Sequence, residues 1–236
     1  MYVPLPSVNR VLVVAPHPDD EALGCGGTIA CYARSGAHVG LVVVSDGAAA
    51  YGRGKGPECL TQLRKAETRA ASDVLGVSHL DALDYPDSRL SEHESDIRRS
   101  LQAVIERFSP ELVLSPSLIE SHPDHVTVAL ILLELLKEQS SWRLAFFEVD
   151  TALRPNVLVP IDQFMAQKDQ AILCYERSLF GKPEVFSGAM KGLSRYRSFA
   201  ARRSSCFEAL WLVPSQPHPH ELLRWIVGDK AFARIA

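Results

Sequence analysis

Short apolar runs alternate with longer amphipathic segments over the first 150 residues, and this alternation constrains the fold more than any other feature. The runs predict strands at 11–15, 38–45, 78–83, 111–115 and 143–149. The segments between them predict helices at about 21–34, 59–75, 92–107 and 124–139. Nearly continuous hydrophobic strands alternating with helices indicate a parallel sheet that is covered on both faces. We therefore expect the α/β class, with a Rossmann-like, doubly wound and mostly parallel sheet.

Residues 151–236 are less regular and predict a C-terminal α/β elaboration of the same domain. The elements expected there are a strand near 156–160, a helix at 162–175, a helix near 189–201, a strand at 206–213 and a last helix near 219–229. No linker separates this part from the Rossmann-like core at about 8–150, so we expect a single domain over 1–236. The Gly-rich stretch 46–58 predicts a mobile loop that could act as a lid.

Composition excludes several classes of protein. A chain of 236 residues with 47% hydrophobic residues can bury a core without disulfides, and a net charge of −3 gives no reason to expect nucleic acid or an anionic membrane as partner. The five cysteines are an odd number without a C-x-x-C pair, as expected for reduced thiols. The longest apolar run is too short to span a bilayer, and the N-terminal segment lacks the pattern of a signal peptide. We expect a soluble, cytoplasmic protein.

The segment "APHPDDEALGCGG" at 15–27 follows the first expected strand and carries the strongest chemical signal. Within five residues it places one imidazole and three carboxylates, at His17, Asp19, Asp20 and Glu21. Adjacent carboxylates repel one another and packing does not require them, so we expect a positive group nearby. In doubly wound sheets strand 1 lies beside strand 4, and ligands bind at the carboxyl ends of the strands. The turn after the fourth strand should then also carry reactive groups.

That turn does carry them. The sequence "SHPDH" places His122, Asp124 and His125 at the start of the next expected helix, with Pro123 suited to its first turn. Two imidazoles and a carboxylate form a common zinc shell with an open fourth position. The candidate ligands are His17, Asp20, His122 and His125. Spacing alone leaves open whether all four close a structural site or three bind and one histidine remains free for acid–base catalysis.

Other residues of the two clusters have simpler interpretations. Asp19 lies between two potential ligands, and we interpret it as a general base for a metal-bound water. Glu21 is expected to head the helix, where its charge gains about 0.3–1 kcal/mol from the helix N-terminus. Either cluster alone would be explained as a capping turn with Asp as the N-cap. The small residues at 24–27 lack the full G-x-G-x-x-G pattern and predict close helix–sheet packing, and His218 and His220 predict a helix-entry turn.

With "HPDDE" at 17–21 and "HPDH" at 122–125, in this order and spacing, the sequence resembles the PIG-L/LmbE-like family of zinc-dependent N-acetylglucosaminyl deacetylases. The resemblance covers most of the chain. Its weaker family-like features are "SDG" at 45–47, Arg64, Glu67, "LDYPDSRL" at 83–90, Lys168 and Glu208.

The resemblance implies roles for individual residues. It implies that one zinc ion is bound by His17, Asp20 and His125. Asp19 would be the general base, His122 would assist as an acid or as an oxyanion stabiliser, and Asp124 would orient an imidazole. Our hypothesis for the mechanism is that a protonated His122 holds the oxyanion and that either Asp19 or His122 delivers the proton to the departing amine. Two further positions, Arg64 and Asp87, match residues that contact the sugar. The implied reaction is hydrolysis of the acetamide of an N-acetylglucosamine-containing small-molecule conjugate, and family members often form homo-oligomers.

Two alternatives remain at this point. Family members acting on small thiol-precursor sugars often have "HPDDVE" where this chain has "HPDDEA", and this departure argues against a thiol-biosynthesis substrate. Separately, a zinc hydrolase of this kind could cleave another amide, such as that of a thiol conjugate or of a longer N-acyl chain. A non-enzymatic metal- or nucleotide-binding module could use Asp19 and Asp20 to hold magnesium for a phosphate. The two histidine motifs disfavour the second alternative, because imidazole suits zinc whereas magnesium prefers oxygen ligands.

Overall fold

The first strand, β1 (Arg10–Ala15), is buried on both faces because its side chains alternate between two hydrophobic clusters. Val11 and Val13 belong to one cluster, whereas Leu12 and Val14 belong to the other. Strands β2 and β4 flank β1, and both run parallel to it. β1 is thus an interior strand of a doubly wound sheet, as the apolar run predicts.

The computed structural model describes residues 2–50, 57–138, 141–214, 222 and 225. Within that part of the chain one seven-stranded sheet has the order β3-β2-β1-β4-β5-β7-β6. The strands after β1 are β2 (His38–Ser45), β3 (His79–Tyr85), β4 (Leu112–Pro116), β5 (Arg143–Phe147), β6 (Val157–Pro160) and β7 (Phe207–Leu212). Strands β1 to β5 are parallel, and β7 runs antiparallel to both β5 and β6. The expected α/β class, with strand 4 beside strand 1, is confirmed.

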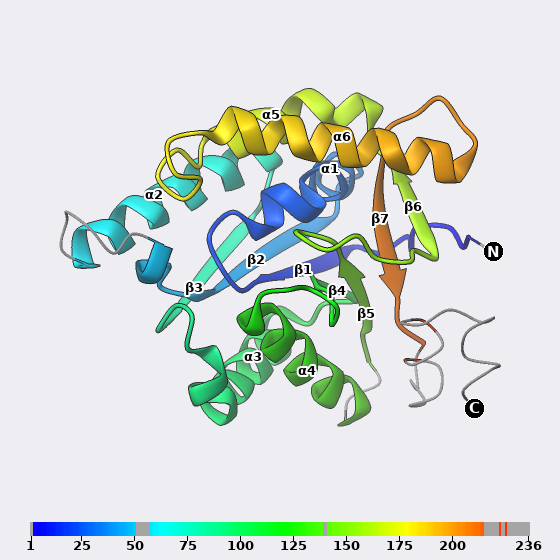
Figure 1. The fold of residues 1–236 in the computed structure, drawn as a ribbon. Coiled ribbons are helices and arrows are strands. Elements are labelled where there is room, and N and C mark those ends of the chain that lie inside the picture. The colour runs from blue at the N-terminus through cyan, green and yellow to red at the C-terminus, as the bar shows by residue number, and fades with distance from the viewer. Residues whose placement is uncertain (1, 51–56, 139–140, 215–221, 223–224, 226–236) are drawn as a thin grey trace.

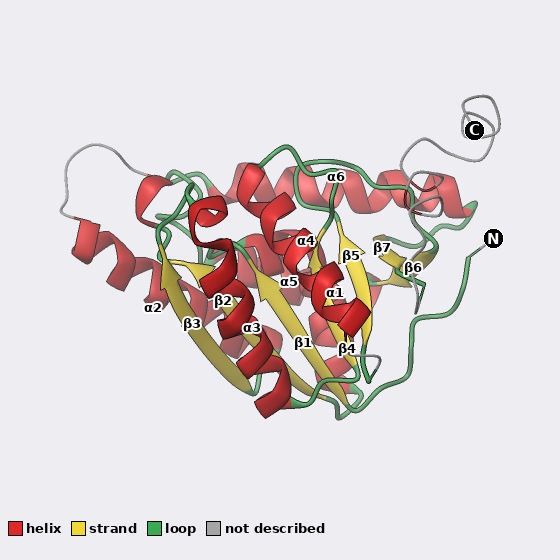
Figure 2. Ribbon diagram, turned by 90° about the horizontal axis from the view of Figure 1, so that it is seen from below, coloured by secondary structure: helices red, strands yellow, loops and turns green. Residues whose placement is uncertain are grey.

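Helices cover both faces of the sheet. They are α1 (Asp20–Arg34), α2 (Pro57–Leu75), α3 (Glu94–Phe108), α4 (Pro123–Glu138), α5 (Met165–Leu173) and α6 (Pro183–Ala201), with short 3₁₀ turns at Ala48–Ala50, Leu90–His93 and Asp162–Phe164. Figure 1 shows α1, α2, α5 and α6 on one face and α3 and α4 on the other, and Figure 2 shows the sheet and its helices after a 90° turn. None of the described helices combines the length and apolar character needed to cross a bilayer.

Most element boundaries lie within a few residues of expectation, and two differences have a physical cause. Strand β5 ends at Phe147 and not at 149, because the Glu120 carboxylate accepts the N–H groups of residues 149–151 and removes them from sheet pairing. Helix α6 begins at Pro183 and not near 189, because proline suits the first turn of a helix. The expected helix at 219–229, His218, His220 and the 51–56 part of the Gly-rich loop lie outside the described residues, apart from 222 and 225.

Helix α1 is interrupted at Cys25, whose φ of −137° and ψ of 22° are not helical. The break leaves N–H groups of the next turn without helical partners, and Glu208 of β7 accepts them. Its carboxylate lies 2.8 Å from the Gly27 nitrogen and 2.6 Å from the Thr28 nitrogen. Lys168 of α5 lies 2.6 Å from the same carboxylate, and this ion pair is buried. The C-terminal elements therefore cap and hold the helix that carries the first motif.

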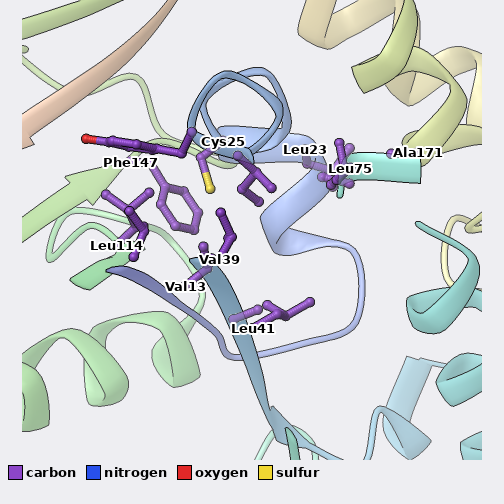
Figure 3. Packing of buried hydrophobic residues seen from close by; sticks show 14 of the residues in the cluster. Val13, Leu23, Cys25, Val39, Leu41, Leu75, Leu114, Phe147 and Ala171 are labelled. Carbon is purple, nitrogen blue, oxygen red and sulfur yellow. The ribbon is translucent and has the colours of Figure 1, made fainter. Parts of the chain in front are cut away.

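The small residues of α1 allow this helix to approach the sheet closely. A Cβ on Gly24 would lie 2.3 Å from Cδ2 of Phe147, and one on Gly27 would lie 2.7 Å from Ile161. Cys25 is fully buried beside Phe147 in the cluster between α1 and the sheet (Figure 3). The expectation of close helix–sheet packing at 24–27 is confirmed.

We predict that Gly24→Ala lowers the free energy of unfolding by about 1–3 kcal/mol, because the added methyl group overpacks the contact with Phe147. The matched control is Gly188→Ala in α6, where a Cβ meets open space. That change should raise stability by about 0.5–1 kcal/mol through helix propensity. Urea unfolding measures both. Equal stability of the two variants would show that α1 has room to move away from the sheet.

Candidate functional site

Two turns that are distant in the sequence meet at the carboxyl ends of β1 and β4. The first turn joins β1 to α1, and the second precedes α4. His17 Nδ1 from the first turn lies 3.2 Å from His125 Nε2 of α4. The convergence of the two His/Asp clusters, which the sequence predicts from strand order, is therefore present.

Three potential ligand atoms form a nearly equilateral triangle. Asp20 Oδ2 lies 3.4 Å from His17 Nδ1 and 3.3 Å from His125 Nε2, which closes the triangle with the 3.2 Å edge between the two imidazoles. A tetrahedral zinc ion with bonds of about 2.0–2.1 Å places its ligands about 3.3–3.4 Å apart. The three side chains are buried, at 8%, 3% and 4% exposure for His17, Asp20 and His125. This donor set and spacing suit one face of a zinc coordination sphere.

Two other groups also have ligand atoms within 4.8 Å of one another: His17 with His122 and His125, and His17 with Asp87 and Asp124. We favour the triangle over both. The Asp124 N–H donates to His122 Nδ1 at 3.2 Å, so this imidazole nitrogen already has a partner. Asp87 and Asp124 approach His17 at Nε2, on the other side of the ring from Nδ1. Whichever of these groups is considered, the described residues place histidines and aspartates of the two turns close enough to bind one metal ion.

His17 has carboxylates on both sides of its ring. Nε2 lies 3.1 Å from Asp124 Oδ2 and 3.2 Å from Asp87 Oδ1, so the Nε2–H form leaves the Nδ1 lone pair free for a metal. Orientation of a ligand imidazole by a carboxylate is the usual arrangement around a bound metal. Burial alone lowers the pKa of His17, but hydrogen bonds with Asp124, Asp20 and Asp87 outweigh it and raise that pKa well above the usual value. The electrostatic potential that the three carboxylates create at the His17 ring therefore favours a positive charge there.

The neighbouring carboxylates are held ionised by the histidines. Burial by itself would raise the pKa of Asp20, but His125 and His17 outweigh it and hold that pKa well below the usual range. The pKa values of Asp87 and Asp124 are also lowered, because the hydrogen bond with His17 outweighs burial. The buried turns therefore hold anionic oxygens directed at the imidazoles.

Asp19 occupies the N-cap position of α1 in an uncommon backbone conformation. Its φ of 111° lies in the left-handed region, which costs a non-glycine residue about 1–3 kcal/mol. Its side chain makes no capping hydrogen bond, so the capping-turn explanation does not apply to it. Burial raises the pKa of Asp19 well above its usual value, the adjacent Asp20 raises it further, and Arg64 opposes both. A strained backbone and a raised pKa are both typical of catalytic carboxylates.

His122 lies beside the triangle and is half-buried, with its ring centroid 4.5 Å from that of His17. Burial lowers its pKa, and the positive charges of His17 and His125 lower it further. Because Nδ1 accepts the Asp124 N–H, the neutral ring carries its proton on Nε2. The lowered pKa favours a neutral His122 that can donate from Nε2, whereas the sequence-based hypothesis has a protonated His122.

Arg64 and Asp87, the expected sugar contacts, also lie at the cluster. Arg64 Nη1 is 3.6 Å from Asp87 Oδ2, and Arg64 Nη2 is 3.5 Å from Asp19 Oδ2. Arg64 is only 3% exposed, and its nitrogens face protein atoms.

Some features of the site differ from expectation or were missed. Glu21 stands in the first turn of α1 as expected, but it is fully buried; burial raises its pKa to about 7, and the Tyr175 hydroxyl donates to it. The expected role of Glu21, a negative charge that interacts with the N-terminus of the helix, therefore does not describe this buried side chain. Glu120, whose Oε2 lies 4.0 Å from His125 Nδ1, and Ser178, which accepts a hydrogen bond from Arg64, had no sequence signal beyond their polarity.

Comparison with known proteins identifies the family. Residues 12–136 match the family model described as GlcNAc-PI de-N-acetylase (PIG-L). A probable N-acetyl-alpha-D-glucosaminyl L-malate deacetylase 2 from Bacillus anthracis is 30% identical over an alignment that covers 70% of this chain and 79% of that protein. The chain belongs to the PIG-L family, as the two motifs predict.

Two further matches extend this result. Diacetylchitobiose deacetylase from Thermococcus kodakarensis is 36% identical over 52% of this chain, and the match spans about half of that relative, 47% of its length. The solved structure of N,N'-diacetylchitobiose deacetylase from Pyrococcus horikoshii, in complex with an inhibitor, has a TM-score of 0.79 and covers 89% of this chain and 85% of its own. At 23% identity this second match shows a shared fold.

We predict that two neighbouring histidines differ in charge at pH 7 once metal has been removed by chelation. His17 should be protonated because its pKa is raised, and His122 should be neutral because its pKa is lowered. Side-chain ¹⁵N NMR over pH 5–9, assigned with His→Gln variants, measures both. A neutral His17 together with a charged His122 at pH 7 would contradict the electrostatics described here.

Proposed function

We propose that this protein is a zinc-dependent hydrolase that removes the N-acetyl group from an N-acetylglucosamine-containing small-molecule conjugate. The observation that carries the proposal is the triangle of His17 Nδ1, Asp20 Oδ2 and His125 Nε2, whose edges of 3.2–3.4 Å suit a single zinc ion. Membership of the PIG-L family supports the reaction, since its named relatives are deacetylases of N-acetylglucosamine compounds.

The three triangle residues would hold one zinc ion per chain. When bound, the ion supplies an activated water by lowering its pKa from about 15.7 toward about 7. Asp124 would keep the His17 ring oriented through Nε2, at 3.1 Å. Because Asp124 also accepts the N–H groups of Ser88 and Leu90, its own position is fixed by backbone.

Asp19 would act as the general base. Its raised pKa makes the carboxylate a stronger base toward the attacking water than an ordinary aspartate is. The water oxygen bonds to the acetamide carbon, the carbon–nitrogen bond then breaks, and Asp19 returns the proton to the departing nitrogen. The second proton of the water passes from the resulting acetic acid to the amine, so the products are acetate and an ammonium group, and atoms and charge balance.

His122 would stabilise the oxyanion as a neutral donor through Nε2–H. A preorganised donor of this kind is worth about 2.7–4 kcal/mol in the transition state. The Asp124 N–H fixes the tautomer of His122, because it donates to Nδ1 and leaves the ring proton on Nε2. The neutral imidazole can therefore donate to the oxyanion without first taking a proton from solution.

The alternatives give different results in a substrate and metal screen. Another N-acyl or thiol-conjugate amidase would bind zinc but release a different acid, whereas a magnesium-dependent phosphate-binding module would release no acetate.

We also propose that the protein forms a homo-oligomer in the cytoplasm. The large apolar side chains exposed on α6, Val185, Tyr196 and Phe199, support self-association, which light scattering tests.

We predict that chelation abolishes acetate release from N-acetylglucosamine conjugates and that one equivalent of zinc restores it. Asp20→Ala and His125→Ala should purify without zinc, whereas His122→Ala should retain it, as metal analysis by mass spectrometry will show. Loss of zinc from His122→Ala would place that residue among the ligands. Full activity in verified metal-free protein would refute the proposed metal role.

We predict that Asp19→Asn keeps its zinc and lowers kcat by about 10²–10⁴-fold, because the amide cannot accept the proton. The matched control is Asp73→Asn, at an exposed position of α2, which should leave kcat unchanged. Steady-state kinetics with acetate detection measures both. Near-normal turnover in Asp19→Asn would show that another group is the base.

A further inference from the structure

Arg64 is surrounded by protein acceptors. Its Nε lies 3.0 Å from Ser178 Oγ, Nη1 lies 2.6 Å from the Gly47 carbonyl, and Nη2 lies 2.9 Å from the Pro18 carbonyl. The Asp19 and Asp87 carboxylates lie 3.5 and 3.6 Å from the same two terminal nitrogens. A guanidinium has five N–H donors. Four of these acceptors lie within hydrogen-bond distance, whereas Asp87 at 3.6 Å forms an ion pair.

Gly47 makes room for this guanidinium. Its φ is +65°, and a Cβ there would lie 2.8–2.9 Å from three atoms of Arg64. Glycine is therefore required both by the backbone conformation and by the closeness of the guanidinium. The "SDG" segment at the end of β2 therefore contributes the glycine against which the Arg64 guanidinium packs.

Ser178 and Glu67 fix the Nε side of the Arg64 guanidinium. The Ser178 hydroxyl donates to Glu67 Oε2 at 2.8 Å, which leaves its oxygen to accept from Arg64 Nε. Glu67 also accepts the backbone N–H groups of residues 177 and 178, so the segment between α5 and α6 is held against α2. The donor and acceptor directions along this chain of contacts are thereby defined, because a carboxylate can only accept.

The far end of this chain of contacts is the turn that carries Asp19. Arg64 holds the carbonyl of Pro18, which belongs to the peptide immediately before the left-handed Asp19. The same guanidinium faces the Asp19 carboxylate. Since Asp19 has no capping hydrogen bond of its own, the described residues offer no other side chain that fixes both its backbone and its carboxylate.

We propose that Arg64 is a positioning residue, which holds the Pro18–Asp19 peptide and the Asp19 carboxylate in place, and that Ser178 and Glu67 form the support that holds Arg64. This inference rests on the proposed function, in which Asp19 is the base. It differs from the sugar contact that the family resemblance implies for Arg64, because the guanidinium is buried and four of its five N–H groups already bond to protein acceptors.

The test compares Ser178→Ala with Ser187→Ala. Both serines are buried, and both hydroxyls bond a carboxylate, that of Glu67 for Ser178 and that of Asp169 for Ser187. Ser178→Ala should lower kcat by about tenfold to a hundredfold with KM unchanged, the effect of a misplaced catalytic group. Ser187→Ala should keep the wild-type kcat. Zinc content and urea unfolding establish that each variant is folded and loaded.

Arg64→Lys should give the same pattern more strongly, with kcat lower by at least about a hundredfold and KM within about twofold, because one ammonium cannot reach the separate acceptors. A rise in KM at unchanged kcat for either variant would overturn the proposal and restore a direct sugar contact. Equal kcat in Ser178→Ala and Ser187→Ala would overturn the supporting role of Ser178.

A crystal structure of Arg64→Met separates this inference from the proposed function. We expect Asp19 to leave the left-handed region when the guanidinium is replaced by an uncharged chain of similar length. Retention of the left-handed Asp19 would overturn the positioning role. If zinc-loaded wild-type protein released no acetate from any conjugate, the proposed function would fail, and this structural readout would still decide whether Arg64 positions Asp19.

Discussion

The parallel pairing of β1 with β4 is the constraint on which the site depends. Val11, Leu12 and Val13 pair in register with residues 112–114, so both strands end at the same edge of the sheet. The turns that follow them are about a hundred residues apart in the sequence, yet they bring His17 and His125 within 3.2 Å. This is the switch point of a doubly wound sheet, where the chain changes direction and side chains from two turns can surround one ligand.

A buried cluster of acids and imidazoles is costly to form unless its charges are compensated. The pKa values of Asp20, Asp87 and Asp124 are lowered by their contacts with histidines, and the pKa of His17 is raised by the same carboxylates. Such an arrangement attracts either a proton or a metal ion to the same place. A metal ion bound here, as proposed, would compete with that proton, and its affinity would therefore depend on pH.

Sequence alone was sufficient for most strands and for placing strand 4 beside strand 1, because residues buried on both faces leave an unbroken apolar run such as 11–14. It was also sufficient for the position of the reactive turns. It could not show that Glu208 caps an interrupted helix, because neither proline nor strong polarity marks the break at Cys25. Nor could it show that Ser178 meets Arg64, since that contact depends on how the α5–α6 segment packs on α2.

The interruption of α1 makes this helix depend on residues from the C-terminal part of the chain. The family model matches residues 12–136, which contain every side chain proposed to bind metal or transfer protons. Glu208 and Lys168, which secure the broken helix beneath those side chains, come from later in the chain. Residues outside the segment that matches the family model therefore help to hold the helix that begins at Asp20.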